Sequence, residues 1–343
     1  MKHFELTSES KVNVIGITLF RIKLTVDCKW GSKGDLGGWI QKEENISGDA
    51  WLYGDAEVYG DARVSGNARV YGDAWLYGDA RVYGNARVYG NAWLSGNARV
   101  SGNAWVYGDA WVYGDAEISG DANVRGEAKV SDNAKVCGDA WITGSALING
   151  FVEISDNAEI SGFAEIRDKV KIQENALVKD NCIISGNAII RGNAILMGFA
   201  SVYDNAIIDE DATISNDAKV YGNAKINGSA MIFDEAEVYD NAQIYDRVMI
   251  GCKAKIFGDA TLLGYEQIFG NARIKDNNDY LTFRYSWGDG SYFTWTKSDN
   301  LWCSGGFTFT RDEFIKHAHS INEKNGMMIE QYIKLVENLN KIS

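Results

Sequence analysis

Residues 50–68 read Ala50-Trp-Leu-Tyr-Gly-Asp-Ala56-Glu-Val-Tyr-Gly-Asp-Ala62-Arg-Val-Ser-Gly-Asn-Ala68. The same six-residue period continues without a slip to Ala272, and an aliphatic residue stands two places after every alanine slot. Alanine is replaced in that slot only by Val152, Val170, Cys182, Val248 and Glu266. Self-similarity at so short a period predicts a solenoid, whose coils stack and bury a continuous core.

Each position of the hexapeptide predicts a place in the coil. The aliphatic residue and the alanine four positions later alternate with polar or aromatic neighbours, so both are expected to point inward. The pair Gly60-Asp61 and its equivalents supply residues that tolerate positive φ at a tight bend. The pattern resembles the hexapeptide-repeat left-handed parallel β-helix, in which three hexapeptides make a triangular coil. The repeat region 40–275 then forms about 12 to 13 coils of stacked strands.

The two ends do not repeat, and a solenoid needs ends that cover its open strand edges. Residues 1–39 are expected to form an N-terminal cap with a strand pair around Ile15 to Val26. Residues 276–343 are expected to form a small α+β module. Its predicted elements are strands at Tyr280–Trp287, Tyr292–Lys297 and Leu301–Phe309, a helix opened by a capping box at Thr310 to Glu313, a break at Asn325-Gly326 and a second helix to about Ile342.

Two flanking motifs resemble a family of uncharacterised phage and prophage hexapeptide-repeat proteins. The first is Leu19-Phe-Arg-Ile-Lys23 together with Lys33-Gly-Asp-Leu-Gly-Gly-Trp-Ile40. The second is Trp302-Cys-Ser-Gly-Gly-Phe307, followed by Thr310 to Phe314 and a helix carrying Tyr332. The resemblance covers the whole chain and implies a phage or prophage origin and a β-helix. It implies no established activity.

Composition favours a soluble, intracellular protein, and the resemblance then implies the cytoplasm of an infected or lysogenic bacterium. The chain has no long apolar run for a membrane helix, and Met1 to Ser10 has no signal-peptide core. Its five cysteines are odd in number and lack CxxC spacing, which indicates reduced thiols. A net charge of −13 argues against non-specific binding to nucleic acid.

Catalytic residues are sparse. Hexapeptide-repeat acyltransferases use a histidine as general base, but the three histidines here, His3, His317 and His319, all lie outside residues 40–275. Acidic corner residues could hold calcium, yet asparagine often fills the same position, so turn formation explains the acids better. We therefore expect no enzyme, no cofactor and no metal site.

Outward ladders of like residues are the candidate binding site. Residues three hexapeptides apart stack, so Trp75, Trp93 and Trp111 are expected to form one ladder with Tyr77 and Tyr113 beside it. A second ladder, on the next face, consists of Arg63, Arg81 and Arg99. Such ladders stabilise stacked coils, but exposed Trp, Tyr and Arg with little Lys are also typical of a recognition surface. Both interpretations stay open.

An apolar stripe in the second half of the repeat is the candidate oligomer interface. Its outward residues are Leu177, Ile195, Met197, Met231, Phe233 and Met249. A stripe of that length is too apolar to leave in water. We expect it to join protomers, with a trimer favoured; the alternative is that the C-terminal module folds back over it.

The sequence as a whole favours a non-enzymatic binding or scaffold protein that engages a host macromolecule or a small ligand through its Trp, Tyr and Arg ladders. One alternative is a structural component of a virion or fibre. Another is a degenerate hexapeptide-repeat acyltransferase. A structural rod does not need asymmetric ladders, and a transferase needs an acceptor base.

Overall fold

A computed structural model describes residues 2–284 and 292–340 of the chain. The fold is a parallel β-solenoid of about 13 turns with a small antiparallel sheet and two helices at its C-terminal end. The chain divides into two compact units, Met1–Met197 and Gly198–Ser343. Each unit is described below by itself.

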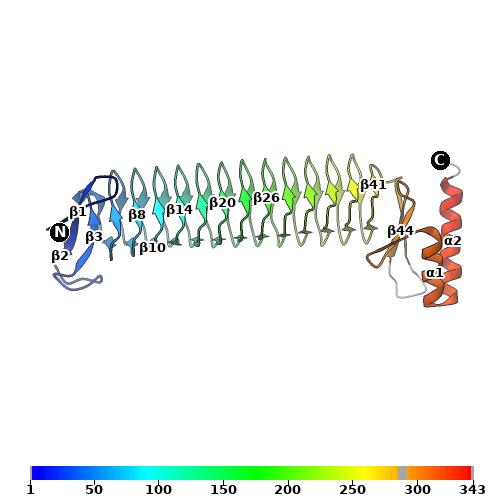
Figure 1. The fold of residues 1–343 in the computed structure, drawn as a ribbon, viewed down its shortest axis with the longest axis horizontal. Coiled ribbons are helices and arrows are strands. Elements are labelled where there is room, and N and C mark those ends of the chain that lie inside the picture. Colours follow the sequence, from blue (N-terminus) through cyan, green and yellow to red (C-terminus); the bar gives the residue numbers. More distant parts are fainter. Residues whose placement is uncertain (1, 285–291, 341–343) are drawn as a thin grey trace. The chain divides into compact units, whose positions relative to one another are not determined.

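In the first unit, short strands pair with the strand three hexapeptides further along and form three parallel sheets (Figure 1). The tryptophan sheet runs β3 (Leu36–Ile40), β5 (Glu57–Val58), β8 (Trp75–Leu76), β11 (Trp93–Leu94), β14 (Trp111–Val112), β17 (Lys129–Val130), β20 (Leu147–Ile148), β23 (Glu165–Ile166), β26 (Ile183–Ile184). The tyrosine sheet runs β4 (Trp51–Leu52), β7 (Arg69–Val70), β10 (Arg87–Gly90), β13 (Trp105–Gly108), β16 (Asn123–Val124), β19 (Trp141–Ile142), β22 (Glu159–Ile160), β25 (Leu177–Val178), β28 (Ile195–Leu196). The arginine sheet runs β6 (Arg63–Val64), β9 (Arg81–Val82), β12 (Arg99–Val100), β15 (Glu117–Ile118), β18 (Lys135–Val136), β21 (Glu153–Ile154), β24 (Lys171–Ile172), β27 (Ile189–Ile190).

The second unit repeats the arrangement with three further runs of parallel strands. One is β29 (Ser201–Val202), β32 (Lys219–Val220), β35 (Glu237–Val238), β38 (Lys255–Ile256), β41 (Arg273–Ile274). Another is β31 (Thr213–Ile214), β34 (Met231–Ile232), β37 (Met249–Ile250), β40 (Gln267–Ile268). The third is β30 (Ile207–Ile208), β33 (Lys225–Ile226), β36 (Gln243–Ile244), β39 (Thr261–Leu262).

The inward slots form the core, as the period predicts. The aliphatic residue of every repeat is buried, and so is the residue in every alanine slot, with typical exposed fractions of 0% at Ala80 and Val82. Alternation along each two-residue strand therefore sends one side chain inward and the other outward. Glu266 is the one carboxyl in an alanine slot, and burial raises its pKa.

The corners explain the glycines. Every sixth residue from Gly48 to Gly270 has a positive φ, which glycine adopts without a steric cost. A Cβ added at Gly102 would lie 2.7 Å from the carbonyl oxygen of Gly120 in the next coil. Where the slot holds an acid instead, its carboxylate usually accepts a hydrogen bond from the next coil. Asp132 Oδ2, for example, accepts from the backbone N–H of Gly150 at 3.1 Å.

The N-terminal end is an antiparallel sheet. β1 (Phe4–Val12) pairs with β2 (Thr18–Leu24), β2 pairs with β3, and β3 pairs in parallel with β5. A short 3-10 helix, η1 (Glu43–Asn45), follows. The expected strand pair around Ile15 to Val26 was wrong at its start, because Ile15 lies in the turn. Asn13 Oδ1 closes that turn by accepting hydrogen bonds from the N–H groups of Ile15 and Ile17, at 3.2 and 2.9 Å.

The C-terminal sheet has four strands, β42 (Tyr280–Arg284), β43 (Tyr292–Thr296), β44 (Leu301–Ser304) and β45 (Phe307–Phe309). The predicted single strand Leu301–Phe309 was wrong, because Gly305 and Gly306 have φ values of 58° and 84° and form a two-residue hairpin turn. The end of the predicted strand Tyr280–Trp287 lies outside the described residues.

Two helices follow, α1 (Arg311–Ile321) and α2 (Glu323–Asn340). The capping box at Thr310 is confirmed, with the Thr310 N–H donating to the Glu313 carboxylate at 2.8 Å. The predicted break at Asn325-Gly326 was wrong. The chain turns at Asn322, whose Oδ1 accepts from the Asn325 N–H at 2.8 Å. Gly326 stays helical, and a Cβ there would lie 2.2 Å from the His319 ring. Ile342, the predicted end of the second helix, is outside the described residues.

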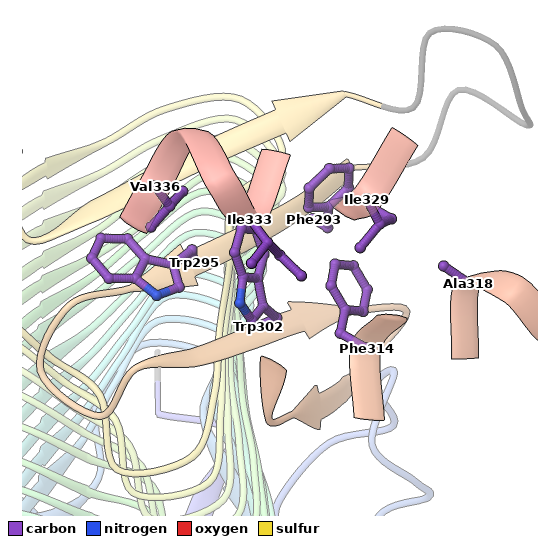
Figure 2. Close-up of a cluster of buried hydrophobic side chains, with 8 residues drawn as sticks. All are labelled: Phe293, Trp295, Trp302, Phe314, Ala318, Ile329, Ile333 and Val336. Atoms are coloured by element: carbon purple, nitrogen blue, oxygen red, sulfur yellow. The ribbon is translucent and has the colours of Figure 1, made fainter. Parts of the chain in front are cut away.

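A compact aromatic core joins these helices to the sheet. Figure 2 shows Phe293, Trp295 and Trp302 from β43 and β44 facing Phe314 of α1 and an aliphatic stripe of α2. The Trp302 and Phe314 rings stack at 5.4 Å between centroids. The sheet also covers the last coil, since Gln267 N–H donates to Thr294 Oγ1 and Gly306 N–H donates to Gln267 Oε1, both at 3.2 Å. Covered strand edges resist edge-to-edge association.

Candidate functional site

The arginine ladder lies in one column of the arginine sheet. Arg63 pairs in register with Arg81, and Arg81 with Arg99, across the parallel strands β6, β9 and β12. Each arginine side chain is exposed. The next residue along each strand is a buried valine, which anchors the strand in the core. Parallel strands lie about 4.8 Å apart, so the three side chains start at that spacing.

Little counter-charge accompanies this ladder. Arg99 Nη1 forms an ion pair with Glu117 Oε1 at 3.0 Å, and no carboxylate of the described residues forms one with Arg63 or Arg81. Further along the same column the charges alternate, with Lys171 bound to Glu153 at 2.8 Å. Like charges directly opposite one another destabilise a sheet. The chain as a whole is acidic, with a net charge of −13, so this run of three cations forms a local basic patch.

Of the two corner acids before the first two arginines, Asp61 is shared with another cation. Asp61 and Asp79 precede Arg63 and Arg81 by two residues and are exposed. Asp61 Oδ1 accepts a hydrogen bond from Lys42 Nζ at 2.7 Å, and this bond is the main reason that the pKa of Asp61 is lowered. Its carboxylate is thus already engaged by another cation.

The arginine groove is the hollow that these side chains line. It is an open groove of about 440 Å³, and its lining consists of Ser47, Arg63, Ser65, Arg81, Tyr83 and Arg99. The lining offers guanidinium donors and hydroxyl groups and contains no carboxylate. Such a surface suits an anionic ligand that also carries hydroxyl groups. Sequence reasoning missed Ser47, Ser65 and Tyr83, although the step of three hexapeptides between them places them in one column.

The tryptophan ladder lies on the tryptophan sheet, in the predicted order. The rings of Trp75 and Trp93 stack at 5.0 Å and those of Trp93 and Trp111 at 4.8 Å, nearly parallel. Lys129 Nζ lies 5.2 Å from the outer Trp111 ring. Stacking occupies the ring faces, so the ladder offers mainly ring edges to solvent. Trp111 is its most open member, with 39% of its surface exposed.

Tyr77 and Tyr113 are both half-buried. Tyr77 stacks on Tyr59 at 5.3 Å and packs against a cluster with Trp39 and Leu19 near the N-terminal sheet. Ser95 holds the position between Tyr77 and Tyr113 in this column. The two tyrosines therefore do not form a continuous ladder of their own.

A further aromatic ladder lies on the tyrosine sheet. Tyr89 and Tyr107 stack at 4.7 Å, and Arg125 Nη1 donates to the Tyr107 hydroxyl at 3.1 Å. The Arg87 guanidinium lies over the Trp105 ring at 4.8 Å. These cations are already engaged by aromatic rings, in contrast to those of the arginine groove.

The apolar residues proposed as an oligomer interface occur in both units. In the first unit Leu177 pairs in register with Ile195, and these two and Met197 are half-buried. In the second unit Met231 pairs with Met249. Phe233 is partly engaged within its own unit. Its ring lies over Gly251, where a Cβ would be 2.5 Å away, and contacts Phe269 at 5.8 Å between centroids.

In a hollow of about 600 Å³ in the second unit, some of the lining side chains form hydrogen bonds within the solenoid. Asn216 Nδ2 donates to Asp234 Oδ1 at 3.1 Å, and Asp234 Oδ2 accepts from the Cys252 N–H at 3.0 Å. These hydrogen bonds hold adjacent coils together. The lining also contains the carboxylates of Asp217 and Glu235, so this hollow suits an anionic ligand less well than the arginine groove does.

The three histidines have structural partners. His3 Nε2 lies 3.1 Å from the Ala50 carbonyl oxygen, and His317 stacks on Phe309 at 4.9 Å. His319 lies between Glu323 and Glu330, at 3.0 and 3.2 Å, and hydrogen bonds to these carboxylates raise its pKa. Within residues 2–284 and 292–340, no group of three or more His, Cys, Asp or Glu side chains is arranged to hold a metal ion.

Comparison with known proteins supports the fold. The family model described as YdcK Beta solenoid repeat matches residues 62–78, 80–96, 94–108 and 98–114, a region that contains both the arginine and the tryptophan ladder. A crystal structure from Desulfovibrio desulfuricans G20, described as a "putative acetyltransferase", is 10% identical, with a TM-score of 0.24 over 88% of this chain and 80% of that one. No match was found among curated proteins.

In the part of the chain that the structure describes, no helix is both long enough and apolar enough to cross a membrane.

Proposed function

We propose that the chain is a non-enzymatic binding protein of phage or prophage origin, and that it acts in the bacterial cytoplasm. It engages a host macromolecule or a small ligand through the outward ladders of its first unit. The observation that carries this proposal is the run of Arg63, Arg81 and Arg99, in which, among the described residues, only Arg99 forms an ion pair with a carboxylate. A ladder that only held coils together would be more stable with alternating charges, as further along the same column.

The tryptophan ladder is the second contact surface in this proposal. Its ring faces are occupied by stacking, so a partner would meet the ring edges and the exposed part of Trp111. Aromatic and arginine side chains often dominate the binding energy of an interface. The arginine and tryptophan ladders lie on different sheets, so a partner that touches both must wrap around a corner of the coil.

Catalysis by an acyltransferase mechanism has little to support it. The histidine that such enzymes use as general base is missing from residues 40–275. His317 and His319 lie on α1, where each already has a neighbouring ring or carboxylate as partner.

Capture from a bacterial extract tests the binding role. The full chain is immobilised, and retained proteins and carbohydrates are compared with those held by an Arg63→Gln, Arg81→Gln double variant. Lys135→Gln is the matched control, since Lys135 lies on the same sheet between Glu117 and Glu153. We expect the double variant to lose material that the wild type and the control both retain. Equal retention by all three proteins would contradict the proposal.

A further inference from the structure

Building on the proposed binding role, we infer that the arginine groove binds a linear acidic polysaccharide. Its carboxylate or sulfate groups pair with Arg63, Arg81 and Arg99, and its hydroxyl groups bond to Ser47, Ser65 and Tyr83. Guanidinium groups donate only, and they match carboxylate and sulfate oxygens well. The serine and tyrosine hydroxyls both donate and accept, which is what sugar hydroxyl groups require.

The spacing of the cations favours a polymer over a single small anion. The three arginines start at intervals of about 4.8 Å along one column, a total of about 10 Å. A small anion meets one or two of them, whereas a chain with regularly spaced acidic groups meets all three. An extended peptide places the side chains of one face about 6.6 Å apart, so its acidic side chains would not match arginines that are about 4.8 Å apart.

The length of the site is also defined. On one side the run of cations ends where Arg99 pairs with Glu117 at 3.0 Å. On the other side Ser47 belongs to the first coil of this face, next to the bridge between Ile46 and Val64. The groove therefore accepts a segment with about three acidic groups, one for each arginine, on strands about 4.8 Å apart.

A nucleic acid fits this groove less well. Proteins that bind single strands stack the bases on open aromatic faces beside a basic track. Here the faces of Trp75, Trp93 and Trp111 are stacked on one another, on another sheet. Tyr83, 41% exposed, is the one aromatic residue that lines the groove. A single ring suits the apolar face of one sugar better than a run of bases.

Titration calorimetry with the full chain tests this ligand class. The probes are oligogalacturonate of three or more residues, dextran sulfate, neutral dextran, and oligothymidylate with the same number of charges. We expect an acidic polysaccharide to bind at least tenfold more tightly than oligothymidylate and neutral dextran, with an affinity that falls as salt rises. The tighter of the two acidic polymers identifies carboxylate or sulfate as the preferred group.

Variants tie the binding to the groove. Arg81→Gln should weaken the binding of the acidic polymer at least tenfold, and Lys135→Gln should change it less than twofold, with both folds checked by circular dichroism. Absence of binding by both acidic polymers, equal binding of neutral dextran or oligothymidylate, or full affinity of Arg81→Gln would each overturn the inference. If the double variant still loses captured material from the extract while no acidic polysaccharide binds, the binding role stands and only this ligand class fails.

Discussion

The carboxylate of Asp240 accepts a hydrogen bond from the backbone N–H of Gly258, which fills the same corner one coil further along, at 3.1 Å. Asp240 has a φ of 58°, a conformation that costs most residues energy. The hydrogen bond links two coils and offsets part of that cost. This contact explains how aspartate or glutamate replaces glycine at many corners without disturbing the stack.

Substitution of Asp240 should separate the two roles of the side chain. Asp240→Ala loses the hydrogen bond but keeps a Cβ in the left-handed region, so the free energy of unfolding should fall by about 1 to 3 kcal/mol. Asp240→Gly also loses the bond but relieves the backbone, so its loss should be smaller. Chemical denaturation measures both. Equal losses would show that the backbone conformation contributes nothing.

The inward and outward faces of the coil differ sharply in what they tolerate. Val82 is fully buried, so Val82→Asp places an unpaired charge in the core and should prevent folding or lower stability by several kcal/mol. Arg81→Asp, one residue earlier on the exposed face, places a carboxylate between two arginines and should leave the fold intact. Thermal melting measures both variants. Similar melting of the two proteins would refute the assignment of faces.

The solenoid could be predicted because every hexapeptide repeats the same pattern of inward, outward and corner residues. Alanine and valine positions set the inward face, and glycine at every sixth residue sets the corner. The secondary structure of the two ends was predicted less accurately, because the ends lack this repetition. In the strand Phe4–Val12 the apolar alternation stops after Leu6, so little signals the strand. Asn322, not Asn325-Gly326, separates the helices because its side chain caps α2.

For the candidate site, the period gave the columns but not the environment of each side chain. It placed Arg63, Arg81 and Arg99 in one ladder, as the strand register shows. It predicted the tryptophan ladder, but it did not reveal that stacking leaves mainly ring edges exposed, or that Tyr83 lines the arginine groove. Those features depend on side-chain rotamers and on residues in neighbouring columns, which the repeat pattern of the sequence does not specify.

His319 predicts a pH dependence in the C-terminal helices. Its ring nitrogens lie within hydrogen-bond distance of the Glu323 and Glu330 carboxylates, and hydrogen bonds donated to these carboxylates raise its pKa above the ordinary value of 6.5. The protonated form is therefore favoured in the folded state, and its stabilisation is present below pH 6.5 and is lost as pH rises through the raised pKa. Thermal melting followed by helical circular dichroism should show a decline above pH 6.5 that His319→Gln removes.

His317→Gln is the matched control for this pH effect. His317 lies two residues earlier on α1 and stacks on Phe309. The His317→Gln protein should keep the pH dependence of the wild type. A His319→Gln protein whose stability falls with pH as steeply as that of the wild type would show that other groups cause the decline.

Self-association through the apolar residues gives a prediction of mass. We expect light scattering to report a multiple of 37.9 kDa, with three copies favoured. Met231 is 41% exposed and Ile195 is half-buried, so Ile195→Lys with Met231→Lys places charges in the proposed interface and should lower the mass. Leu263→Lys, at a position that is 52% exposed outside the stripe, is the control. A monomer at high concentration would contradict the interface.

The tryptophan ladder can be tested at its open end. Trp111 stacks on Trp93 at 4.8 Å on one face and meets Lys129 on the other. Trp111→Ala removes one stacked pair, which contributes about 0.5 to 1.5 kcal/mol, so the protein should stay folded with a modest loss of stability. If the ring edges also contact the partner, capture from a bacterial extract should fall several-fold. Trp141→Ala, on the tyrosine sheet and 43% exposed, should retain capture. Full capture by Trp111→Ala, together with lowered stability, would mean that the ladder only holds the coils together and that the arginine groove alone recognises the ligand.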